Sequence, residues 1–317
     1  MDLGLHLPLM EFGGEGITAR RIEAAVDAAR RCGFAAVSAN DHYVFSTPWL
    51  DGPSALASVV ERSGGMTLAT TVANVVLRGP VALAKALAAI DVLSGGRMLA
   101  GVGPGSSARD CEAVGIPFEE RWPRLDEAIT VLRALVRGEP PPAQTRYYPV
   151  PSEELGPAPV AKGGIPVWIG SWGSAAGLRR VARLGDGWLA SAYNTTPEGF
   201  AAAREGLEAE LRERGRRSDG FPNALATMWT WVTEDRAEAD RVLSEVLAPL
   251  LRRDPADLSG LLCIGPAGEC AELLSRYAAG GCRRVYLWPL GDDQRQIERV
   301  VEQVTPQIDA VSMVGSA

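Results

Sequence analysis

The chain has 317 residues, of which 46% are hydrophobic and 22% are charged. That composition is typical of a globular protein and excludes a disordered chain, because it provides enough apolar side chains to bury a full core. The net charge of −7 argues against nucleic acid or an anionic membrane as the main partner, since both require a basic surface, and leaves a small-molecule substrate as the default.

Short β-rich runs alternate with longer amphipathic stretches, the pattern of a parallel sheet built from βαβ units. The predicted strands are Asp2–Pro8, Phe34–Ala39, Met66–Asn74, Arg97–Val102, Ile165–Gly170, Gly187–Ala192, Ala224–Val232 and Arg283–Pro289. The predicted helices are Thr18–Arg31, Val81–Leu93, Arg124–Arg137, Ala175–Leu184, Pro197–Arg214, Arg236–Leu251, Gly268–Ala279 and Gln294–Ile308. Eight of each predict an α/β fold that closes into a (β/α)8 TIM barrel, as one domain over residues 1–317.

Two stretches are too long for simple connections between a strand and a helix. Gly138–Lys162 is rich in proline and tyrosine, and we interpret it as an inserted loop or short hairpin over the mouth of the barrel. Asp254–Gly265 is a second irregular excursion. Pairs such as Gly95-Gly96, which follow a predicted helix, are typical of helix ends in left-handed geometry.

The cysteines and the N-terminus bear on the compartment. The chain has an odd number of scattered cysteines without a C-x-x-C pair, which favours reduced thiols over disulfides or a zinc site. They are Cys32, Cys111, Cys263, Cys270 and Cys282. No basic, long apolar leader opens the chain, and no run of 18 apolar residues occurs. We therefore expect a cytoplasmic protein with no membrane partner.

Only two histidines occur, His6 and His42, and both fall at the ends of predicted strands. Reacting groups of β/α barrels come from the carboxyl ends of strands, so both positions are candidates for the active site. The alternative for each is a histidine hydrogen-bonded in a loop or core. For His42 the catalytic interpretation is favoured, because Asp41-His42 follows the second strand directly and aromatic residues, including Trp49, come next.

Two glycine-rich turns follow predicted strands. In Gly101–Ser107 the glycines allow either a tight turn or the close approach of a flat ring, and the pattern alone is weak for nucleotide binding. Gly170–Ser174 precedes a helix carrying Arg179 and Arg180, so free backbone N–H groups, hydroxyls and guanidinium groups could cradle a phosphate. A plain serine N-cap is the alternative there.

The sequence lacks the residues that several other types of enzyme require. Lys85 lies in a predicted helix and Lys162 in a loop, so no lysine is placed for a Schiff base at a strand end. The two histidines occur without H-x-H or H-E-x-x-H, which disfavours a metal site, and no G-x-S-x-G elbow is present. A cofactor enzyme is favoured over a hydrolase or aldolase.

Motifs in the same order over nearly the whole chain resemble the bacterial luciferase-like family. They are Leu68–Pro80, Asp91–Arg97, Gly101–Gly105, Ala113–Arg121, Arg124–Ala128, Ile165–Gly170 and Ala182–Trp188. The resemblance implies a β/α barrel, a homodimer and a flavin-type coenzyme. Within the family, Asp41-His42 is similar to the pair that members using coenzyme F420 place beside the reactive ring carbon, with flavin mononucleotide (FMN) as the alternative.

The resemblance also implies roles for individual residues. His42 would be the general acid or base, and Asp41 would orient it or tune its charge. Thr71-Val72 occupies the position where the family often carries a non-prolyl cis peptide behind the ring. Ser106 stands where deazaflavin-dependent sugar-phosphate dehydrogenases have a glutamate, with Asp110 or Glu112 as possible substitutes. The coenzyme-binding candidates are His6, Thr71, Val72, Gly103, Gly105, Ser106, Ser107, Gly170, Ser171, Trp172, Gly173 and Ser174.

Three functions remain open from the sequence. The first is F420-dependent hydride transfer to or from a small organic substrate, the second is an FMN-dependent monooxygenase, and the third is a flavin-binding barrel without turnover. Trp49, Trp172 and Tyr193 are expected at the substrate pocket, with core packing as the alternative for each.

Overall fold

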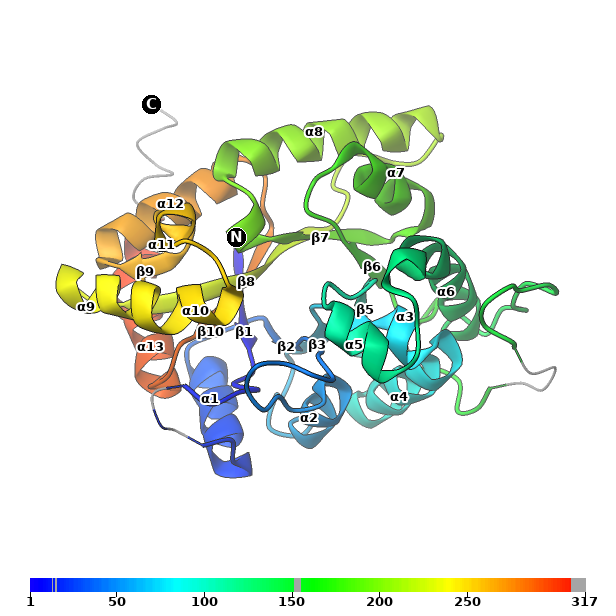
Figure 1. The fold of residues 1–317 in the computed structure, drawn as a ribbon, viewed down its shortest axis with the longest axis horizontal. Helices are drawn as coiled ribbons and strands as arrows, with labels where there is room; N and C mark the ends of the chain where they lie inside the picture. Colours follow the sequence, from blue (N-terminus) through cyan, green and yellow to red (C-terminus); the bar gives the residue numbers. More distant parts are fainter. Residues whose placement is uncertain (13, 15, 151–154, 309–317) are drawn as a thin grey trace.

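The structure is a computed structural model that describes every residue except 13, 15, 151–154 and 309–317. Its strands form one sheet with parallel pairing, and the contact between β10 and β8 closes eight of them into a barrel surrounded by helices (Figure 1). The strands are β1 Asp2–His6, β2 Ala36–Ala39, β3 Thr67–Thr70, β4 Ala73–Asn74, β5 Met98–Gly103, β6 Val167–Gly170, β7 Gly187–Ser191, β8 Asn223–Val232, β9 Cys263–Gly265 and β10 Arg284–Pro289. The predicted (β/α)8 barrel is confirmed.

Side chains of alternate strand positions fill the interior of the barrel. Trp168, Leu189 and Tyr286 are large, and they pack with the alanines Ala36 and Ala69 in one buried cluster. Alternation of large and small residues in this way fits a tapering barrel. Two glycines are required by the same packing. A Cβ at Gly4 would lie 2.5 Å from the ring of Tyr286, and one at Gly187 would lie 2.5 Å from the ring of Trp168.

Helices cover the outside of the barrel. Several begin with a side chain that caps a backbone N–H, such as Thr18 for α1 and Thr196 for α8. The longer helices are α1 Ala19–Arg31, α4 Pro80–Ser94, α6 Arg121–Leu135, α7 Ala175–Leu184, α8 Pro197–Glu213 and α12 Ala267–Ala279. The shorter ones include α2 Gly52–Ser58, α3 Val75–Arg78, α5 Ala108–Ala113, α9 Arg236–Arg241, α10 Ala248–Leu251, α11 Pro255–Leu258 and α13 Asp293–Arg299. None of the helices in the described part of the chain is long and apolar enough to cross a bilayer.

The predicted strands all appear, with two differences. Met66–Asn74 is divided into β3 and β4 by a cis peptide bond between Thr71 and Val72, which pairs β4 separately with β5. The irregular excursion Asp254–Gly265 contains α11 and the short strand β9, which pairs with the far end of β8. The left-handed geometry predicted for Gly95 is confirmed by a φ of 69°.

The placement of the inserted segment Gly138–Lys162 over the mouth is wrong for its described residues. The Asp91 carboxylate accepts hydrogen bonds from the backbone of Val160 and Ala161, and Glu127 accepts from the backbone of Tyr147 and of its two neighbours. Asp91 lies in α4 and Glu127 in α6, so the segment packs on outer helices. It contains no strand outside residues 151–154, which lie beyond the described residues.

Candidate active site

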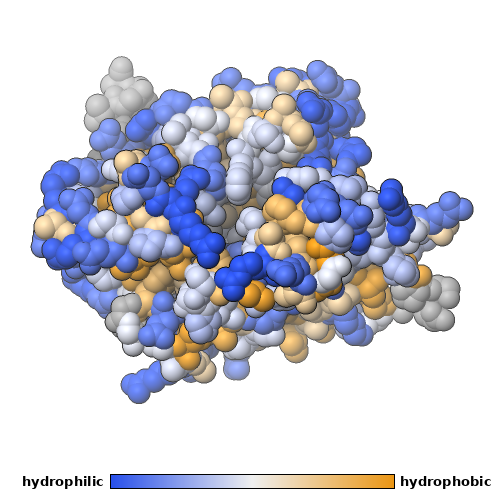
Figure 2. Space-filling model, in the orientation of Figure 1, coloured by the Kyte–Doolittle hydropathy of each residue, from blue (hydrophilic) through white to orange (hydrophobic). Residues whose placement is uncertain are grey.

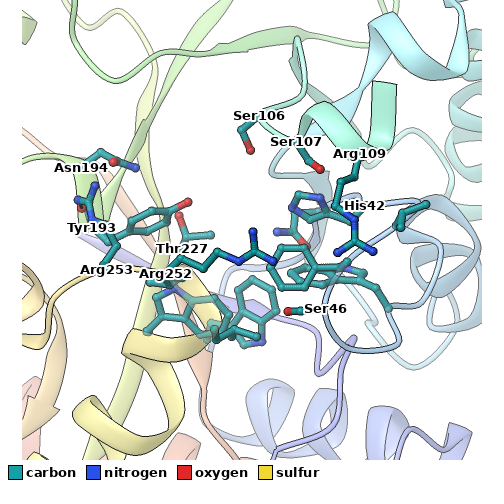
Figure 3. Close-up of a pocket in the computed structure, with 18 of the residues that line it drawn as sticks. His42, Ser46, Ser106, Ser107, Arg109, Tyr193, Asn194, Thr227, Arg252 and Arg253 are labelled. Atoms are coloured by element: carbon teal, nitrogen blue, oxygen red, sulfur yellow. Dashed lines mark hydrogen bonds between the residues drawn. The ribbon is translucent and has the colours of Figure 1, made fainter. Parts of the chain in front are cut away.

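A cavity of about 440 Å³ opens at the carboxyl ends of the barrel strands. That volume lies within the range of pockets that hold small molecules and cofactors. Six of the residues predicted for the site line it, namely His42, Trp49, Ser106, Ser107, Trp172 and Tyr193. They come from the segments after β2, β5, β6 and β7, so the strand ends bring together side chains that lie far apart in the sequence (Figure 3).

Flat aromatic rings form the base of this cavity. Trp229 of β8 stacks on Trp288 of β10 with ring centroids 3.8 Å apart, and His6 of β1 stacks on the other side of Trp288 at 3.5 Å. Trp49 meets both Trp288 and His42 edge-on. Trp229, Trp288 and Trp49 line the cavity, whereas His6 is fully buried beneath it. The cavity therefore offers an apolar, planar surface beside a histidine.

His42 is held by Asp110 rather than by its neighbour Asp41. The Nδ1 atom of His42 lies 2.7 Å from Oδ2 of Asp110, which is fully buried. The other oxygen of Asp110 accepts hydrogen bonds from the backbone N–H groups of Tyr43 (3.1 Å) and Val44 (2.6 Å). Ser107 caps α5 and accepts the N–H of Asp110, which fixes this carboxylate in the first turn. Because Nδ1 is engaged, Nε2 is the nitrogen left for a ligand in the cavity.

The expected role of Asp41 in orienting His42 is wrong. The Asp41 carboxylate instead binds Arg78 of α3, with oxygen–nitrogen distances of 2.5 and 2.6 Å, and accepts the backbone N–H of Asn74. Arg78 also pairs with Asp51, the N-cap of α2. The ion pair between Asp41 and Arg78 therefore holds the segment after β2, which carries His42, against the segment after β4.

The glycine turn after β5 packs against Val72, whose peptide bond to Thr71 is cis. A Cβ at Gly103 would lie 2.8 Å from the Val72 side chain, and one at Gly170 would lie 3.0 Å from it. Gly105 has a φ of 82°, as a tight turn requires. The structure therefore supports packing and turn roles for these glycines. Their contact with the ring of a coenzyme stays a prediction.

The turn after β6 has the geometry of a serine N-cap. Ser174 accepts the N–H of Gly177 at the start of α7, and the Ser171 hydroxyl accepts the N–H of Gly173. Arg180, which we expected near a phosphate cradle, binds Asp126 of α6 instead. The N-cap is confirmed, whereas the cradle stays a prediction that no longer includes Arg180.

His6 gives the fold a defined response to acid. Burial lowers the pKa of its imidazole from 6.5 to about 3, although hydrogen bonds to Leu7 and Asn40 oppose the shift. The pKa of His6 is lower in the folded protein than in the unfolded chain. The contribution of His6 to the free energy of unfolding is therefore highest above pH 6.5 and decreases as the pH falls toward 3. We expect the protonation linked to His6 to lower the free energy of unfolding by about 2 kcal/mol at pH 5 relative to pH 7.

The measurement is urea unfolding at pH 7 and pH 5 for the wild type and a His6→Phe variant. The variant is expected to lose less stability between the two pH values, whatever its stability at pH 7. Equal losses in both proteins would contradict a buried neutral histidine.

The cavity fits a flat, polar ring system. Several buried polar atoms in or beside it have no hydrogen-bond partner among the described residues, although buried polar groups are normally paired. They are Trp49 Nε1, Thr71 Oγ1, Trp229 Nε1 and Trp288 Nε1. A planar coenzyme carrying ring nitrogens and oxygens offers partners for such atoms as well as a surface for the indoles.

A model of the luciferase-like monooxygenase family matches residues 6–284, which is most of the chain. The protein belongs to the luciferase-like monooxygenase family. The resemblance predicted from the motifs is thereby confirmed.

Relatives in the luciferase-like family carry out more than one kind of redox chemistry. The chain is 30% identical over 250 residues to a 5,10-methylenetetrahydromethanopterin reductase of Archaeoglobus fulgidus, covering 78% of this chain and 71% of that protein. An F420-dependent secondary alcohol dehydrogenase in complex with an F420-acetone adduct has the same fold, with a TM-score of 0.80, 17% identity and coverage of 97% and 98%. Monooxygenase RslO1 of Streptomyces bottropensis is also similar in fold, with a TM-score of 0.80, 19% identity and coverage of 96% and 99%.

Three parts of this luciferase-like site were missed in the sequence. The first is the pair Trp229 and Trp288, which lie in β8 and β10 and form the aromatic base of the cavity. Asp110 was considered only as a substitute acid, and its signal was the Ser-x-x-Asp spacing from Ser107, which places a carboxylate in the first turn of a helix. Arg252 and Arg253 line the cavity mouth from the segment after α10, where no pattern in the sequence predicted them.

Proposed function

We propose that this luciferase-like protein is an oxidoreductase that uses coenzyme F420 to move a hydride to or from a small organic substrate. One observation carries the proposal. His42, oriented by the buried carboxylate of Asp110, stands at the wall of a flat aromatic cavity at the mouth of the barrel. The sequence similarity to F420-dependent glucose-6-phosphate dehydrogenases of Rhodococcus jostii (30% identical over 184 residues) and Microbacterium testaceum (26% over 317 residues) supports F420 over FMN.

The residues that would hold the coenzyme surround the aromatic base. Trp49, Trp229 and Trp288 would contact the ring, and their free indole N–H groups would donate to its polar atoms. Ser106 and Ser107 line the same cavity with hydroxyl groups. When bound, F420 supplies or accepts the hydride. Trp172 also lines this cavity. The remaining candidates are not among its lining residues and stay proposals, namely His6, Thr71, Val72, Gly103, Gly105, Gly170, Ser171, Gly173 and Ser174.

His42 would handle the proton that accompanies the hydride. With Nδ1 bound to Asp110, a proton on Nε2 points to the cavity, and His42 donates it to the substrate oxygen or nitrogen during reduction. In the oxidative direction Nε2 accepts that proton. The Asp110 carboxylate stabilises the imidazolium form and fixes the ring, which is a positioning role.

The test is turnover without oxygen. Reduced F420 is mixed anaerobically with a panel of ketones, aldehydes, imines and activated alkenes, and coenzyme oxidation is followed by absorbance. We expect at least one acceptor to be reduced in stoichiometric amount. A parallel assay in air uses reduced FMN in place of F420. If the protein acts only there and consumes oxygen, it is a monooxygenase and the proposal is wrong. If it binds coenzyme tightly but turns over no substrate, it is a non-catalytic flavin-binding barrel.

We also propose a homodimer in the cytoplasm. The proposal of a dimer is based on the family resemblance. Light scattering tests it by measuring the molar mass of the purified protein in solution. The five cysteines are free in the structure, which suits a reducing compartment.

A further inference from the structure

The charged side chains at the cavity mouth all have the same sign. Three arginines line the cavity, Arg109, Arg252 and Arg253, whereas none of its described lining residues is Asp or Glu. The whole chain has 39 acidic and 32 basic residues, so the mouth is opposite in charge to the protein. A cavity of one sign with low-dielectric walls attracts ligands of the other sign.

Arg252 occupies a backbone conformation that favours glycine. It ends α10 with φ 52° and ψ 48°, in the left-handed region. Its own N–H bonds to Pro249 O and that of Arg253 bonds to Ala248 O, so the turn is well defined. Glycine is the usual residue here because a Cβ is unfavourable in this geometry. An arginine therefore lowers stability, and that loss is explained if its side chain has a function.

The arginines face one another across the mouth. Figure 3 shows the Arg252 side chain extending over the middle of the cavity, with Arg109 beside His42 on the opposite side and Arg253 next to Tyr193. Arg253 donates to the carbonyl oxygen of Tyr193 at 3.0 Å, which ties the segment after α10 to the segment after β7. Hydrophilic side chains cross the middle of this face in Figure 2.

We infer that the substrate of the proposed reaction is a small organic anion, a carboxylate or phosphate, whose charged group binds between Arg252 and Arg109. Guanidinium groups suit both kinds of anion because they donate paired hydrogen bonds. Ser46, Ser106 and Ser107 add hydroxyl donors around the same space. Arg109 directly precedes Asp110, so an anion held there lies near His42, where the rest of the substrate can react.

The coenzyme phosphate is the competing source of negative charge. Its expected cradle, Gly170–Ser174, follows β6, whereas Arg252 and Arg253 belong to the segment between β8 and β9. Trp172 of that cradle lines the same cavity as the arginines, so the second measurement below separates the two ligands. That the bound anion is the substrate depends on the proposed function. That an anion binds between the arginines does not.

The first measurement is calorimetric binding of benzoate and benzamide, which share a shape and differ in charge, to the protein without coenzyme. We expect benzoate to bind at least tenfold more tightly than benzamide. In an Arg252→Gly variant that preference should fall at least fivefold, while the melting temperature stays equal or rises because the left-handed position is relieved. Arg31→Ala, an exposed arginine at the end of α1, is the charge-matched control and should keep the preference. Equal binding of the two probes to the wild type would overturn the proposal.

The second measurement separates the substrate from the coenzyme. Binding of F420 and of its phosphate-free fragment, the deazaflavin ring with its ribityl chain, is followed by fluorescence in the wild type and in Arg252→Gly. We expect the substitution to leave both affinities within about twofold. Weaker binding of F420 alone would assign the arginines to the coenzyme phosphate and overturn the proposal. If neither form binds the wild type, the proposed function fails, and a benzoate preference would still support the anion site.

Discussion

Replacement of His42 with alanine is expected to lower kcat by about 10²–10⁴-fold, the usual contribution of a general acid or base. The substitution removes the Nε2 proton that the substrate requires and leaves the aromatic base of the cavity in place. The dissociation constant of F420 should change by less than about threefold. Single-turnover kinetics with reduced coenzyme separate these two effects.

Asp110→Asn provides the matched test of positioning. The amide keeps the size of the side chain but removes the charge that stabilises an imidazolium at His42. We expect kcat to fall while coenzyme binding is retained, and the double variant with His42→Ala to be no slower than His42→Ala alone. An unchanged rate in a His42→Ala protein that still binds F420 would show that His42 is not the catalytic acid or base.

The second large effect concerns stability. Arg78→Met is expected to lower the unfolding free energy by about 3–5 kcal/mol, because it leaves the carboxylate of Asp41 buried without its charged partner. The Asp41 side chain is only 1% exposed and makes two close contacts with the guanidinium group. Burial alone would lower the pKa of Arg78, but the hydrogen bonds and charges of Asp41 and Asp51 raise it. Urea unfolding at pH 7 measures the loss.

A second variant distinguishes the unpaired charge from lost packing. Arg78→Met combined with Asp41→Asn removes both charges, so it should be more stable than Arg78→Met alone. If the single variant loses less than about 1 kcal/mol, the pair does not brace the segment that carries His42.

Much of the fold could be predicted because the strands of a parallel barrel are largely buried and helices such as α1 and α7 are amphipathic. The strand β5, buried at every position, is an example. The strand β9 was missed because three residues carry too little periodic signal. The segment Gly138–Lys162 was placed wrongly because its composition shows only that it is irregular. Its position depends on Asp91, 69 residues before Val160, and on Glu127, 20 residues before Tyr147, and its composition identifies neither partner.

The candidate site was predicted where it depends on strand ends and missed where it depends on distant pairs. His42 follows β2 directly, so its place at the mouth could be predicted. Its partner could not, because Asp110 lies 68 residues away, whereas the adjacent Asp41 turns toward Arg78. Arg252 reaches the mouth only through the left-handed turn that ends α10, a conformation that the sequence does not suggest for arginine.

The most direct test of the central claim is equilibrium binding of the purified protein to F420 and to FMN, each oxidised and reduced, followed by fluorescence. The account predicts micromolar or tighter binding of F420 in preference to FMN, because the aromatic base and its free indole N–H groups would hold the deazaflavin ring. Preferential binding of reduced FMN, or binding of neither coenzyme, would contradict it.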